Sequence, residues 1–240
     1  MERRSFVNWL VILVIGLMIL MTVIGYKRGF IKIILSLLSM IVTLFLTSLF
    51  TPYVKDFLME ETAIASTIQT EVSNYFQEAL GDSLEQAQLS VGQQMQMIED
   101  LPLPNSILQV LKENNNSAIY DVLGVDTFTE YISGYLTQMI MSAIAFVLTF
   151  LLVYVIVRIV FFALNFIGHL PIIKGINKLL GGIVGFIQGI ILLWLLSLVL
   201  TAFSGTEWGI QLMQMVQESA LLSIIYNNNV LLKLILHSIF

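Results

Sequence analysis

The chain has 240 residues, of which 58% are hydrophobic and only 11% are charged, and its mean hydropathy is +0.90. Soluble domains carry roughly 25% charged residues, so this composition excludes an ordinary soluble protein and predicts one that is partly solvated by lipid. The absence of cysteine excludes disulfides, thiolate metal sites and a thiol nucleophile. The formal net charge of −5 conceals an uneven distribution along the chain.

Four apolar stretches predict transmembrane helices, because a hydrocarbon core of roughly 30 Å is spanned by about 20 apolar residues in a helix. In chain order they are residues 6–24, 33–50, 139–157 (continuing past Arg158 to 167) and 179–203. Thr51 and Pro52 are predicted to end the second helix. The first stretch is interpreted as an uncleaved anchor, since its apolar core is long and no A-x-A cleavage site follows it.

Between the second and third stretches, residues 51–138 contain thirteen acidic residues and two basic ones. Apolar residues recur there at helical spacing, as in Ile64, Ile68 and Val72, so we expect a small helical extramembrane subdomain rather than a linker. In residues 205–240 the apolar groups are too interrupted for a fifth span. They predict amphipathic helices that lie at the membrane interface or fold onto the acidic segment.

The expected architecture is therefore an all-α integral membrane protein with two pairs of transmembrane helices. Residues 1–50 form the first pair, 51–138 the acidic helical segment, 139–204 the second pair and 205–240 the amphipathic tail. The short connections within both pairs are basic, through Lys27, Arg28, Lys32, Lys174 and Lys178. Basic short loops predict the cytoplasmic side, which places the termini and the acidic segment outside; Arg3 and Arg4 favour the opposite orientation.

Gly181, Gly185 and Gly189 form a GxxxGxxxG repeat at the start of the fourth stretch. Small residues four apart share one helix face and let another backbone approach closely. The spacing predicts close packing without naming the partner. Packing within the chain, a seam between copies in a homo-oligomer, and the lining of a pore all remain open.

A stripe of polar residues follows one face of the second stretch, with separations of three or four residues: Lys32, Ser36, Ser39, Thr43 and Thr47. The stripe is interpreted either as a packing face against the glycine repeat or as a hydrophilic path through the protein. Arg158 lies late in the third stretch, where it either snorkels to the interface or has a functional role. Gln188 is expected to bond across helices or to Arg158.

Several kinds of chemistry lack the residues that they require. His169 and His237 are the two histidines, they are far apart in the sequence, and no aspartate lies in any predicted span. The glycine-rich stretch at 181–185 is not followed by the Lys-Ser/Thr of a P-loop. We therefore predict no enzyme activity, no metal, no cofactor and no binding of nucleic acid.

Two motifs lie in a suggestive order: Gly-Tyr-Lys-Arg-Gly-Phe at 25–30 and Ile-Asn-Lys-Leu-Leu-Gly-Gly-Ile-Val-Gly-Phe-Ile-Gln-Gly at 176–189. With the segment 218–226, they resemble the signatures of the colicin V production protein (CvpA) family. The resemblance implies a multi-pass protein of the bacterial inner or plasma membrane with a part in toxin production or export. Gly25, Lys27, Arg28 and Gly29 would form its basic cytoplasmic turn, and the long acidic segment departs from the compact members.

Two functions are consistent with these features. The first is a non-enzymatic accessory or scaffold protein, in which the acidic segment docks an extracytoplasmic partner. The second is a small channel or transporter that uses the polar stripe of the second span.

Overall fold

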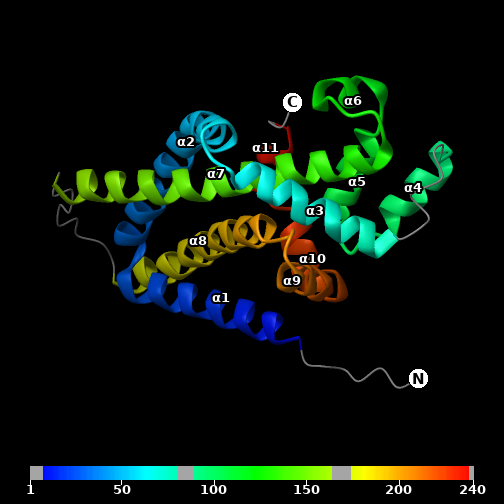
Figure 1. The fold of residues 1–240 in the computed structure, drawn as a ribbon. Coiled ribbons are helices and arrows are strands. Elements are labelled where there is room, and N and C mark those ends of the chain that lie inside the picture. The colour runs from blue at the N-terminus through cyan, green and yellow to red at the C-terminus, as the bar shows by residue number, and fades with distance from the viewer. Residues whose placement is uncertain (1–7, 81–88, 164–173, 238–240) are drawn as a thin grey trace, which may run out of the picture. The chain divides into compact units, whose positions relative to one another are not determined.

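The computed structural model describes residues 8–80, 89–163 and 174–237, and every regular element in these ranges is an α-helix (Figure 1). The helices are α1 (Trp9–Arg28), α2 (Phe30–Glu60), α3 (Ile64–Leu80), α4 (Val91–Glu99), α5 (Asn105–Glu113), α6 (Ser117–Leu123), α7 (Phe128–Ala163), α8 (Lys174–Ala202), α9 (Glu207–Glu218), α10 (Ala220–Asn227) and α11 (Val230–His237).

Four of these helices, α1, α2, α7 and α8, are long and apolar enough to cross a membrane. Their most apolar 18-residue windows have mean hydropathies between 2.5 and 2.8. The four predicted spans and the all-α membrane fold are therefore confirmed. Large apolar side chains such as Ile19, Phe45 and Ile159 are exposed on them, as expected for surfaces that face hydrocarbon.

The second helix does not end where the sequence predicted. α2 continues through Pro52 to Glu60. Proline lacks an N–H and so removes one helical hydrogen bond, but beyond it Leu58 is buried, with 6% of its surface exposed. Packing of this last stretch compensates for the lost bond. Helices in membrane proteins tolerate proline in this way because nearby hydroxyls and neighbouring helices satisfy local backbone groups.

The first connection is shorter than the predicted turn of residues 25–29. α1 remains helical through Arg28, and Gly29 alone leaves the helix, with φ of 79° and ψ of 161°. Residues that carry a side chain rarely adopt this φ, so glycine permits the reversal into α2. Lys27 and Arg28 consequently occupy the last turn of α1, where positive charge is favoured by the partial negative charge of the helix C-terminus.

The chain divides into two compact units, each assembled from two separate stretches. Unit 1 comprises Met1–Val54 and Phe146–Leu196, and its described residues other than Asn8 and Gly29 belong to the four membrane helices. A buried cluster of Ile33, Leu37 and Val184 packs α2 against α8 in this unit. Unit 2 comprises Lys55–Ala145 and Ser197–Phe240, so the acidic segment and the tail share one compact body.

Unit 2 is held together by apolar packing and by buried and partly buried hydrogen bonds. The Tyr131 hydroxyl of α7 donates to the Leu111 carbonyl of α5 at 2.6 Å, and both residues are fully buried. In the tail, the Gln217 amide donates to the Leu103 carbonyl, and the Asn227 Oδ1 accepts from the Ser106 N–H at 3.1 Å. The tail thus packs on the acidic segment, one of the two placements that the sequence left open.

Candidate functional site

In unit 1, α1 and α8 approach each other closely at glycines. Gly25 of α1 faces Gly181 of α8 so closely that a methyl group on either residue would overlap the carbonyl oxygen of the other. A methyl group on Gly185 would lie 2.5 Å from the Met21 carbonyl oxygen. One on Gly189 would lie 3.1 Å from the Met18 sulfur. We call Gly25, Gly181, Gly185 and Gly189 the glycine seam.

The partner of the glycine repeat is therefore α1. The interpretation that the repeat packs on the polar stripe of α2 is not what the structure shows. The sequence spacing identifies the packing face of α8 but not Gly25 as its counterpart, because the motif at 25–29 predicts a turn and one sequence does not show which helices pack together. α1 and the first part of α8 run side by side in Figure 1, as this seam requires.

The basic ends of α1 and α8 lie together. A Cβ at Gly29 would be 2.5 Å from the Asn177 side-chain nitrogen, so the reversal after α1 abuts the first turns of α8. The Lys178 Nζ lies 5.9 Å from the centre of the Tyr26 ring, within range of a cation–π interaction. Lys27 and Arg28 are exposed beside this pair. One end of unit 1 is consequently basic.

The polar stripe of α2 becomes more buried along the helix. Lys32 is exposed and Ser36 is half-buried, whereas Ser39, Thr43 and Thr47 are buried. The Thr43 hydroxyl donates to the Ser39 carbonyl and the Thr47 hydroxyl to the Thr43 carbonyl, both at 2.8 Å. These threonines thus satisfy their donors within their own helix, as hydroxyl groups in apolar helices commonly do.

Gln188 bonds across helices rather than to Arg158. Its Nε2 donates to the Ser36 Oγ at 3.2 Å and joins α8 to α2, while its Oε1 is buried without a partner. Arg158 is exposed on α7 among apolar residues such as Ile156 and Ile159, and it forms no ion pair among the residues that the structure describes. His169, Arg3 and Arg4 lie outside those residues, as does the side chain of His237.

Two further surface features were not anticipated from the sequence. An apolar groove of about 450 Å³ lies on the α1–α8 pair, lined by Thr22, Val23, Tyr26, Leu179, Gly182, Ile183 and Phe186. A polar cleft of about 590 Å³ in unit 2 is lined by side chains of the acidic segment and tail, including Asp100, Asn105 and Gln214. The spacing within each helix is regular, but a single sequence does not show which helices are neighbours.

In the described part of the chain, no group of three His, Cys, Asp or Glu side chains is arranged to hold a metal ion. The described arrangement therefore offers close helix packing, a basic end, an apolar groove and an acidic helical body. Each of these features suits binding and assembly.

Comparison with known proteins identifies one family. The family described as "Colicin V production protein" matches residues 10–80 and 117–229. No curated protein and no solved structure matches the chain. The family match omits residues 81–116, which contain α4 and α5 and lie within the acidic segment. Because the match covers well over half of the chain, including all four membrane helices, this multi-pass membrane protein belongs to the Colicin V production protein family.

Proposed function

We propose that the protein is a non-enzymatic accessory or scaffold factor of the bacterial plasma membrane, acting in toxin production or export or in a related envelope process. Its acidic segment, residues 51–138, would dock an extracytoplasmic partner with a basic surface. Membership of the Colicin V production protein family supports the process, and the charge distribution of unit 2 supports the mode of action.

The observation that carries the proposal is the exposure of the carboxylates in residues 51–138. Ten of the thirteen acidic side chains are described, and all ten are exposed. Among the described residues, one of these carboxylates forms an ion pair: Glu99 Oε1 lies 2.5 Å from the Lys112 Nζ. Glu113 accepts a hydrogen bond from Gln109, and Glu130 accepts from the N–H groups of Asp126 and Thr127. The other exposed carboxylates are left for solvent or a partner. The alternative explanation of these exposed carboxylates is that they form only a solvated face. Where charges do contribute to docking, they act mainly on steering and specificity.

The helices that carry these charges are held by contacts to neighbouring elements, and this favours docking. Tyr120 and Tyr131 stack with ring centres 5.0 Å apart, and the Asn114 amide donates to the Tyr135 hydroxyl at 3.4 Å. These contacts tie α5 and α6 to α7, while Gln217 ties the tail to the segment between α4 and α5. A supported helical surface loses less conformational entropy on binding than a flexible acidic linker would.

The orientation in the proposal rests on the basic end of unit 1. Lys27, Arg28 and Lys178 gather there, and short basic connections favour the cytoplasmic side. α2 then carries the chain across the membrane toward the acidic segment. The non-enzymatic part of the proposal rests on composition, since the chain has no cysteine and only two histidines.

Co-purification from native membranes tests the docking function. Five exposed carboxylates without described hydrogen bonds or ion pairs are suitable for neutralisation to the corresponding amides: Glu61, Glu71, Asp100, Asp121 and Asp126. We expect the neutralised variant to lose its partner. The matched control exchanges Asp and Glu at the same five positions, keeps the charge and should retain the partner. An unchanged partner list in the neutralised variant would contradict docking.

The alternative function is a small channel or transporter, and the unpaired Oε1 of Gln188 beside Ser36 is the observation that favours it. The cysteine-free chain permits a direct comparison. Cysteine is placed singly at Ser39, Thr43 and Thr47 and probed with a water-soluble thiol reagent in membranes. A water-filled path predicts reaction at these buried positions, whereas the scaffold proposal predicts none. Cysteine at the exposed Lys32 serves as the reactive control.

A further inference from the structure

The apolar groove on the α1–α8 pair owes its shape to the absence of a side chain at Gly182. A Cβ there would lie 3.7 Å from the Tyr26 Cβ and 3.8 Å from the Thr22 carbonyl oxygen, so a methyl group would fit in ordinary van der Waals contact with α1, and Gly182 lines the groove. The adjacent Gly181 differs, because its backbone is in contact with α1. One glycine therefore closes the helix pair, and its neighbour forms the floor of an open groove.

The walls of the groove face outward. Phe186, Ile183 and Leu179 on α8 are 48%, 54% and 64% exposed, and Tyr26 and Val23 on α1 are 48% and 41% exposed. Both helices are apolar enough to cross a membrane. Within the hydrocarbon core such a groove would be filled by an apolar group, because no water is present there to occupy it. The occupant is thus an acyl chain or an apolar helix.

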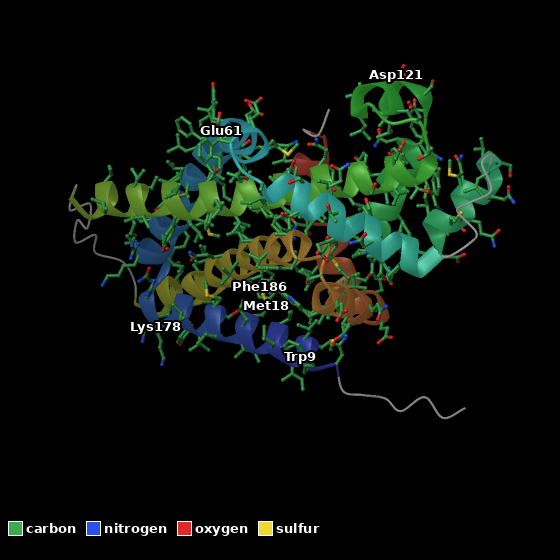
Figure 2. All side chains as sticks on the ribbon, in the orientation of Figure 1. Trp9, Met18, Glu61, Asp121, Lys178 and Phe186 are labelled. Carbon is green, nitrogen blue, oxygen red and sulfur yellow. The ribbon has the colours of Figure 1, made fainter. Side chains whose placement is uncertain are left out.

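The charge at one end of the groove selects between these occupants. Lys178 stands over Tyr26 near the start of α8, and Lys27 and Arg28, the next two residues of α1, are exposed (Figure 2 labels Lys178 and Phe186). The described residues of unit 1 contain no aspartate or glutamate, so none of their side chains neutralises this positive end. Basic residues beside a membrane helix attract anionic headgroups by about 1 kcal/mol each.

We propose that this groove binds one anionic phospholipid. One acyl chain lies over Gly182 between Tyr26 and Phe186, and the phosphate is bound by Lys178 with support from Lys27. A second copy of the chain would bring an identical basic end to the same place, and its positive charges would repel those already present. The charge complementarity therefore favours the lipid.

Native mass spectrometry of the full chain in detergent tests the site with added phosphatidylglycerol or phosphatidylcholine of the same acyl chains. The unaltered protein should retain phosphatidylglycerol in preference to phosphatidylcholine. Lys178→Gln should weaken the retention of phosphatidylglycerol by about fivefold, the effect of one lipid-facing cation. Lys32→Gln removes the same charge from α2 and should have a smaller effect. Equal losses in the two variants would overturn the site, since they would indicate general surface attraction.

Filling the groove gives an independent test. Gly182→Leu should abolish retention of phosphatidylglycerol, whereas Gly16→Leu adds the same bulk to α1 at a place with open space and should not. Circular dichroism and size-exclusion chromatography check that both variants fold, and Lys178→Gln tests the site without changing the groove. If the unaltered protein retains no lipid but forms a dimer that Gly182→Leu dissociates, the occupant is a second copy and the proposal is wrong.

Discussion

Adjacent glycines of α8 have opposite tolerances at the scale of single residues. Gly181 meets the Gly29 Cα and the Gly25 carbonyl, while Gly182 has only ordinary van der Waals neighbours. A side chain at the first must displace backbone, and backbone in a packed helix pair does not yield as the end of a flexible side chain does. The glycine seam is therefore a steric requirement at particular positions rather than a general preference for small residues.

This contrast gives a matched prediction. Gly181→Ala should destabilise the protein by about 1–3 kcal/mol, the usual cost of overpacking, and Gly182→Ala should change stability by less than about 0.5 kcal/mol. The measurement is thermal unfolding in detergent, followed by the loss of monodisperse protein. Equal losses for the two variants would show that α1 and α8 do not meet at Gly181.

Tyr226 illustrates a buried polar contact in the tail. Its hydroxyl lies 2.7 Å from the Thr201 hydroxyl, which already donates to the Ser197 carbonyl, so Tyr226 is the donor of this hydrogen bond. Tyr226 is 1% exposed, and burial raises its pKa above the ordinary value of 10.0. The folded state thus holds this proton at a pH where the unfolded chain releases it.

Tyr226→Phe should cost about 1 kcal/mol of stability at pH 8, the net value of a typical hydrogen bond. Above pH 10, Tyr226 ionises in the unfolded state of the unaltered protein. This ionisation lowers the free energy of unfolding by about 1.4 kcal/mol per pH unit, and the variant, which has no hydroxyl at this position, does not lose stability in this way. The deficit of the variant should therefore shrink as the pH rises from 9 to 11 in chemical-denaturation curves. A deficit that grows over this range would contradict the assignment.

At the scale of elements, the sequence predicted what depends on local pattern and missed what depends on neighbours. The four membrane helices follow from their long apolar runs, and α3 follows from the spacing of Ile64, Ile68 and Val72. Pro52 was misleading because a local rule for ending helices was outweighed by packing beyond it, at Leu58. The faces of α1 and α8 that meet have no local signature of their pairing.

The packing of α10 in unit 2 gives a prediction for adjacent leucines. Leu222 is 5% exposed and Leu221 is 42% exposed. Leu222→Ala should destabilise unit 2 by about 2–5 kcal/mol, and Leu221→Ala should cost much less because it creates no internal cavity. Limited proteolysis checks this, since cleavage of residues 89–127 tracks the population of the opened state. Similar cleavage rates in both variants would mean that α10 is not anchored to the acidic segment.

At the scale of the whole molecule, charge and apolarity are sorted between the two units. The described residues of unit 1 hold six basic residues and no acidic ones, whereas residues 51–138 of the chain hold thirteen acidic residues and two basic ones. Such sorting is expected when one part of a chain sits in lipid near a negatively charged leaflet and another projects into water. The family match spans both units and leaves out residues 81–116.

The proposed function requires the acidic segment to lie outside the cytoplasm, where an extracytoplasmic partner can reach it. The most direct test is labelling of single cysteines in intact cells with a membrane-impermeant thiol reagent, since the chain has no cysteine of its own. Asp121→Cys, at an exposed position of α6, should be labelled in intact cells. Lys27→Cys, at the basic end of unit 1, should be labelled only after lysis. The reverse pattern would place the acidic surface in the cytoplasm and contradict the proposed function.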